Sequence, residues 1–147
     1  MYCTLEDLKK ALPERILLQL TDDENEEQFV ISPPNGAYSR VVSAITDADS
    51  MIDGYVSGRY TLPFPVVPQL IKQISVNLTI CGLYERNHEA ELPEAIISRR
   101  KAFIKTLESL QDGTIVLPGQ EKEEPAQYLV SKTDADQEFP DSLLNQY

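Results

Sequence analysis

A proline-rich connector between two helical patterns constrains the fold of this chain more than any other sequence feature. The stretch from Tyr55 to Tyr84 reads YVSGRYTLPFPVVPQLIKQISVNLTICGLY. Pro63, Pro65 and Pro68 each fix their own φ, lack an amide donor and push the preceding residue out of the α region. We therefore predict a stiff, extended connector that sets the angle between the two helices it joins.

Apolar residues recur at helical spacing on both sides of this connector. From Ala37 to about Gly58 they fall every three or four residues, with Asn35 as the expected N-cap and Gly58 as a left-handed C-cap. From Pro68, which suits the first helical position, to Tyr84 they occupy nearly every side of the helix. A helix that is apolar all round needs neighbours on all sides, so we predict that it is the centre of the fold.

Three further helices are expected around this centre. A hydroxyl and two carboxylates in the segment Thr4–Asp7 predict a helix start, and Pro13 favours a second short helix over Glu14–Leu20. The last helix is predicted to open at Pro93 and end at Gly113. Its inward residues are expected to be Ile96, Ile97, Phe103, Ile104, Leu107 and Leu110. The sequence thus predicts an all-α fold, a compact bundle of about four to five helices.

Charge and cysteine content limit the classes of function. The 147 residues carry a formal net charge of -11, so at neutral pH the chain repels phosphate backbones and anionic membranes. There is no apolar run of about 18 residues and no secretory signal at the start, so we expect a cytosolic protein without a membrane partner. Cys3 and Cys81 are too few and too dispersed for a disulfide framework or a zinc site, and we interpret both as free thiols.

An acidic run, DDENEE at residues 22–27, raises the question of calcium binding. An EF-hand loop needs glycine at its sixth position and a bidentate glutamate at its twelfth. The two possible registers put Glu27 or Gln28 at the sixth position and Pro33 or Pro34 at the twelfth, so both fail. We interpret the run as a solvated loop, and a calcium site is the less favoured alternative.

The remaining titratable residues do not form a catalytic set. Asp47, Asp49 and Asp53 fall on the polar side of the helix before the connector, with no histidine nearby, so we interpret them as a solvated face. His88, the only histidine, lies in a glutamate-rich loop without a nucleophile to activate, and a surface role is expected. We therefore expect no enzymatic activity, no cofactor and no metal.

Arg59 is expected to stabilise the connector. It follows Gly58 and precedes Tyr60, so its guanidinium can hold backbone carbonyls or Asp53 within this joint. Loss of the Arg59 side chain is accordingly predicted to lower stability.

Two features are expected to contact other molecules. One is a basic cluster on the outer side of the last helix, formed by Arg99, Arg100, Lys101 and Lys105. These residues either pair with the helix's own glutamates or contact an acidic neighbour, such as the loop or tail of another copy.

The other feature is the acidic tail, residues 120–147, which we separate from a helical domain of residues 1–119. It holds seven acidic residues against two lysines, a composition that cannot bury enough surface to order alone. Tyr128 and Phe139 are aromatic residues spaced along the tail, and their side chains are expected to contact a partner. Part of the tail is therefore expected to order on a partner, and a plain flexible tail is the alternative.

The stretch from Ile52 to Arg86 resembles a family of small proteins encoded in the head-gene cluster of Mu-like phages and prophages. The resemblance rests on an order of residues: Ile52, Asp53, Tyr55, Gly58, Arg59, Tyr60, Leu62, Pro63, Pro68, Leu83, Tyr84 and Arg86. It extends over residues 1–118. The sequence departs from the family pattern in the irregular segment 22–39 and in the acidic tail, which looks like an extension.

Members of that family are similar in plan to helical head-to-tail connector proteins that form a ring beneath the portal. The resemblance implies a head completion or adaptor subunit that forms a homo-oligomeric ring and contacts portal and tail-side proteins. Its place would be the virion, and the host cytoplasm during assembly. The resemblance transfers no catalytic residue, no cofactor and no specific nucleic-acid binding. The alternative is an acidic regulatory protein whose tail occupies a basic groove on a partner.

Overall fold

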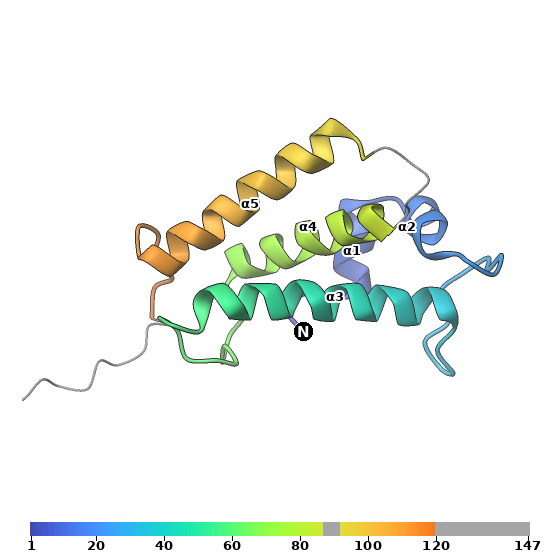
Figure 1. The fold of residues 1–147 in the computed structure, drawn as a ribbon. Helices are drawn as coiled ribbons and strands as arrows, with labels where there is room; N and C mark the ends of the chain where they lie inside the picture. Colours follow the sequence, from blue (N-terminus) through green and yellow to red (C-terminus); the bar gives the residue numbers. More distant parts are fainter. Residues whose placement is uncertain (87–91, 120–147) are drawn as a thin grey trace, which may run out of the picture.

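The computed structural model describes residues 1–86 and 92–119, and this part of the chain forms five α-helices (Figure 1). They are α1 (Leu5–Ala11), α2 (Glu14–Thr21), α3 (Gly36–Val56), α4 (Gln69–Arg86) and α5 (Glu94–Asp112). The only β-type pairing among the described residues is an isolated bridge between Ile31 and Pro34. The prediction of an all-α fold is confirmed.

Two capping side chains and one left-handed glycine explain three of the helix termini. Thr4 and Asp7 form a capping box at α1, in which the Asp7 amide donates to the Thr4 hydroxyl at 3.4 Å and the Thr4 amide donates to the Asp7 carboxylate at 3.1 Å. The Asn35 side chain caps α3 by accepting from the Tyr38 amide at 3.0 Å. Gly113 ends α5 with a left-handed φ of 81°. All three termini lie where the sequence predicts them.

The helix α4 is the centre of the bundle. It contacts each of the other four helices and lies between α3 and α5 in Figure 1. Nine of its residues are buried: Ile71, Ile74, Ser75, Val76, Leu78, Thr79, Ile80, Cys81 and Leu83. It begins one residue later than expected, because the Pro68 carbonyl accepts the first helical hydrogen bond, from the Lys72 amide at 3.0 Å. The prediction of a central apolar helix is confirmed.

The core has two parts, one at each end of α4. We call the first the joint core, because it gathers the connector, the last turns of α3 and α5 and the first turns of α4 around Ile52, Tyr60 and Ile74. The second, the N-terminal core, packs α1 and α2 against α3 and α4 around Leu8, Leu17 and Ile45. Since α5 diverges from α3 toward its first turns, it covers the joint core more closely than the N-terminal core (Figure 1).

The segment after α5 is an apolar strap that closes the joint core. The Ile115 amide donates to the Ser109 carbonyl at 3.0 Å, and the Leu117 side chain is buried. The Leu117 amide donates to the Tyr60 hydroxyl at 3.2 Å, which ties the strap to the connector. The described part of the chain therefore ends beside the joint core.

Two expectations about helix α3 and helix α5 are wrong. Gly58 does not cap α3 in a left-handed conformation: Ser57 is the C-cap with φ -58°, and the Tyr60 amide still bonds to the Val56 carbonyl at 3.0 Å. The chain thus leaves α3 through a right-handed turn that needs no glycine. Ile97 does not face inward but is 39% exposed, because the first turns of α5 lie away from α3.

Candidate interaction surface

The connector residues of the predicted motif build the joint core. Tyr60 is fully buried, its ring centroid lies 6.2 Å from that of Phe64, and its hydroxyl accepts from Leu117. The other motif residues differ in their positions: Tyr55 and Leu62 are partly buried in the joint core, Gly58 and Pro63 are exposed, and Tyr84 packs in the N-terminal core. The motif is therefore a packing feature that reaches from one core to the other.

Arg59 reaches from the connector to the end of α5. A Cβ added to Gly113 would lie 2.3 Å from Nη1 and 2.5 Å from Cζ of Arg59, so the guanidinium packs on the Gly113 backbone. Gly113 also has a positive φ, which side chains rarely tolerate. Two independent constraints thus require glycine at this position, and Arg59 links the connector to the last helix.

We expect Gly113→Ala to lower the free energy of unfolding by about 2 kcal/mol, because it strains the backbone and displaces the Arg59 guanidinium. Urea denaturation followed by circular dichroism measures this loss. The matched control is Gly119→Ala, since Gly119 also has a positive φ, 69°, but has open space around an added Cβ. Its expected loss is no more than about 1 kcal/mol. Equal losses for the two variants would refute the Arg59 contact.

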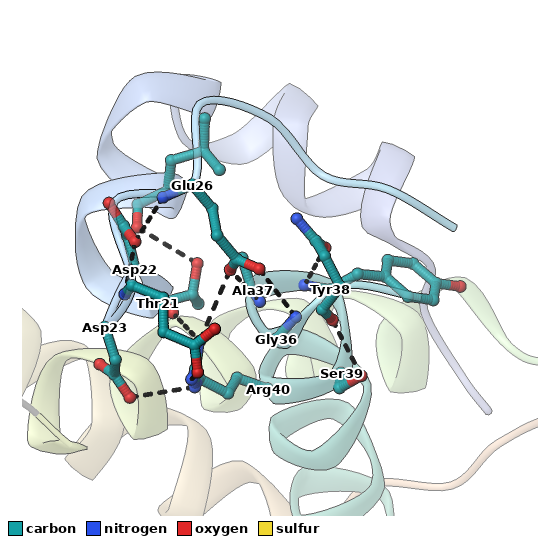
Figure 2. Close-up of polar contacts among 12 residues, drawn as sticks. Thr21, Asp22, Asp23, Glu26, Gly36, Ala37, Tyr38, Ser39 and Arg40 are labelled. Carbon is teal, nitrogen blue, oxygen red and sulfur yellow. Dashed lines mark hydrogen bonds and ion pairs between the residues drawn. The ribbon is translucent and has the colours of Figure 1, made fainter. Parts of the chain in front are cut away.

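The acidic run between α2 and α3 is organised around Arg40 (Figure 2). The Arg40 guanidinium donates to the Thr21 carbonyl at 2.9 Å and lies 3.0 Å from the Asp23 carboxylate. The carboxylates of Glu24 and Glu26 each lie 3.6 Å from it. One cation on α3 therefore gathers three carboxylates of the preceding loop.

The same loop caps the N-terminus of α3. The Glu26 carboxylate accepts from the Gly36 and Ala37 amides at 2.9 and 2.5 Å, where the helix dipole favours negative charge (Figure 2). The Asp22 carboxylate accepts from the Glu24 and Glu26 amides at 3.0 and 2.8 Å. Asp23, Glu24 and Glu27 are exposed, as expected for a solvated loop, but the sequence did not predict that its carboxylates also bind protein partners. No group of acidic, histidine or cysteine side chains able to hold a metal ion occurs within residues 1–86 and 92–119.

The prediction that Asp49 is solvated is also wrong. Asp49 is 9% exposed, and its carboxylate accepts from the Tyr2 amide at 2.8 Å and from the Ser75 hydroxyl at 2.7 Å. Asp53, one turn on, accepts from the Tyr2 hydroxyl. Burial, and then the hydrogen bond to Asp53, raise the pKa of Tyr2. The first residues of the chain are thereby fastened to α3 and α4.

Both cysteines are free thiols, as predicted, and both are buried. Burial raises the pKa of each thiol. The Cys3 sulfur lies 3.2 Å from the Ser75 hydroxyl oxygen, whose single proton is donated to Asp49, so Cys3 belongs to the same buried polar group. Neither thiol is positioned to act as a nucleophile at the surface.

The predicted basic cluster is divided by the structure. Arg100 forms an ion pair with Glu85 of α4. Lys101 and Lys105 line a shallow hollow of about 380 Å³ together with Arg100, Ile104 and Glu108. Arg99 is exposed and does not line this hollow. Tyr128 and Phe139, the other candidate interface residues, lie outside the described residues, as does His88.

A groove of about 710 Å³ lies between α3 and α5. Small residues of α3 line one side, Gly82 and Leu78 of α4 line the floor, and Arg100 of α5 lines the far side. Because Arg100 also lines the shallow hollow, the two hollows adjoin. We call the larger one the α3–α5 groove. The apolar periodicity of the sequence does not predict this groove. The sequence feature that marks it is Gly82, a glycine inside the central helix α4.

A comparison with protein families identifies the chain. The model described as "Bacteriophage Mu, Gp36" matches residues 2–132, most of the sequence. The chain belongs to this family. The predicted relationship to Mu-like phage proteins is confirmed.

A curated relative supports this assignment. Over 70 residues the chain is 33% identical to "Gene product J" of Escherichia phage Mu, a match that covers 48% of this chain and 47% of the relative. The chain therefore matches about half the length of that protein.

The match to the Mu Gp36 family corrects the expected extent of the resemblance. It does not stop at residue 118 but continues to residue 132, so the first part of the acidic tail belongs to the family region. The departure expected after Gly119 accordingly concerns only the last residues. In the described part of this family member, no helix is long and apolar enough to span a membrane.

Proposed function

We propose that the protein is a structural subunit of a phage head-to-tail connector, a head completion or adaptor protein that assembles as a ring beneath the portal. The observation that carries the proposal is the family match over residues 2–132, which makes the chain a Mu-like phage protein. Its partners are further copies of itself, the portal and the tail-side proteins. It acts in the virion and in the host cytoplasm during assembly, without catalysis.

The fold supports this proposal physically. A ring subunit needs a rigid body and two different surfaces that are complementary between neighbours. The described part is a body built on one central helix, with a groove along α3 that begins at Gly36, while the described residues end at Gly119 beside the joint core. The acidic composition also limits sticking to DNA that passes through a ring.

Electron microscopy of the purified full chain, alone and mixed with its portal, tests the proposal. Rings or a stacked complex on the portal are the expected result. A matched sample of the portal alone controls for rings formed by the portal itself. If neither rings nor portal binding occurs at any concentration, the connector function is wrong. Monomers in dilute solution together with binding to the portal would still agree with it, because the portal then acts as the template.

A further inference from the structure

The floor of the α3–α5 groove has an unexplained glycine. Gly82 lies within α4, and a Cβ added to it would meet nothing within 4 Å. Glycine inside a helix costs about 1 kcal/mol relative to alanine, and here no contact of the subunit requires it. Its effect is to leave the groove deep enough for another chain to approach the backbone of the central helix.

The walls of the groove differ in character. Ser43, Ala44 and Ala48 make the middle of the α3 side small, with Arg40, Asp47 and Met51 also lining that side. The α5 side is basic, because Arg100 is followed by Lys101 and Lys105 in the adjoining hollow. Arg100 has Glu85 as its partner, whereas neither lysine has an ion pair among the described residues. A segment that fits must combine apolar side chains with acidic ones.

The start of the acidic tail has this combination. Glu121, Glu123 and Glu124 are followed by the apolar triplet Tyr128, Leu129 and Val130. The family match includes this part of the tail and ends at residue 132, well past the last packed residue of the strap, Leu117. The family region therefore contains a segment that complements the groove in charge and in apolar character.

We propose that the α3–α5 groove binds residues 120–132 of a neighbouring copy, with the apolar triplet over Gly82 and the glutamates toward Lys101 and Lys105. The described chain ends beside the joint core, near the C-terminal ends of α3 and α5 (Figure 1). The groove is lined by α3 from its first residue, Gly36, to Met51, so it reaches the opposite end of that helix. When the binding segment and the groove that receives it lie at different ends of a subunit, neighbouring subunits contact each other head to tail. This type of contact can close a ring. The inference rests on the proposed function, which supplies the neighbouring copy.

The reach of the tail suits this arrangement. Tyr128 follows Gly119 by nine residues, which extend over about 30 Å. The α3 wall from Gly36 to Met51 is about 22 Å long at the helical rise. The triplet can therefore reach the middle of a groove on an adjacent subunit without displacing Leu117 from the joint core.

Disulfide trapping between full-length chains tests the proposal. A Ser43→Cys chain is mixed with a Leu129→Cys chain under mild oxidation, and cross-linked pairs are counted on a non-reducing gel. The control pair replaces Ser43→Cys by Gly54→Cys, a position on the same helix that does not line the groove. The native cysteines are 1% exposed and do not compete. We expect the groove pair to cross-link at least about tenfold more than the control pair.

Three outcomes would overturn the proposal. Equal cross-linking of the groove and control pairs would show nonspecific contact. A cross-link confined to single chains of the double variant Ser43→Cys/Leu129→Cys would show that each tail occupies its own groove. Rings without the cross-link would agree with the proposed connector function but contradict the tail contact. If neither rings nor the cross-link formed, both proposals would be wrong.

Filling the groove provides an independent test with a matched pair of variants. Gly82→Leu and Gly54→Leu both add a helix-favouring side chain where nothing lies within 4 Å of a Cβ, so both are expected to fold with an unchanged or raised Tm. Only Gly82→Leu should lower trapping of the Ser43→Cys and Leu129→Cys chains, by about tenfold. Equal trapping in the two backgrounds would overturn the proposal.

Discussion

Tyr60→Ala is expected to lower the free energy of unfolding by about 3 to 5 kcal/mol, as for other large buried side chains truncated in a core. Tyr60 is fully buried where the connector, α4 and the strap meet. Removal of its ring leaves a cavity beside Phe64 and deprives the Leu117 amide of its acceptor. Urea denaturation measures the loss, and the proposed ring assembly should fail in parallel because the strap loses its attachment.

The control for this variant is Tyr60→Phe, which keeps the ring and removes only the hydroxyl. Its expected loss is about 1 kcal/mol, the cost of one buried amide left without its acceptor. If Tyr60→Ala lost no more than Tyr60→Phe, the joint core would not depend on the packing of this ring. The prediction that the proline-rich segment between α3 and α4 sets the angle between these helices would then be wrong.

Asp49→Ala is expected to lower the free energy of unfolding by about 3 kcal/mol, since it leaves buried donors without an acceptor. The donors are the Tyr2 amide and the Ser75 hydroxyl, at 2.8 and 2.7 Å from the carboxylate. Because they come from the chain start and from α4, the N-terminal segment should also loosen. Hydrogen exchange at residues 2–5 measures this loosening, and thermal denaturation measures the stability.

Two further variants make the Asp49 result specific. Asp49→Asn keeps an oxygen acceptor and should lose less, about 1 to 2 kcal/mol. Asp47→Ala removes an exposed carboxylate two residues earlier on the same helix and should change stability by no more than about 0.5 kcal/mol. Losses of equal size for Asp47→Ala and Asp49→Ala would contradict the buried hydrogen-bonded role of Asp49.

Local signals predicted the helices well. A capping box at Thr4, an N-cap at Asn35 and a left-handed glycine at Gly113 act within one helical turn, so their neighbours in sequence are also their partners in space. The central position of α4 was predictable for a related reason. A helix that is apolar on nearly every side has to be covered, whichever elements cover it.

The surroundings of several acidic side chains could not be predicted from the sequence, because their partners are distant in the chain. The segment from Asp22 to Glu26 is mostly exposed, but its carboxylates bind Arg40 and the N-terminus of α3. Asp49 has the pattern of a polar helix face but is buried against Tyr2 and Ser75, which lie 47 and 26 residues away in the chain. In both cases the partners of a charged side chain are residues that local periodicity does not reveal.

The sequence by itself determined the five helices, the caps at Thr4, Asn35 and Gly113 and the central position of α4, because backbone hydrogen bonding and apolar periodicity are local. Only the tertiary structure decided which polar groups are buried and where a partner can bind. The divergence of α5 from α3 exposes Ile97 and opens the groove above Gly82. These features follow from the angle between helices, which depends on how the joint core packs around Tyr60.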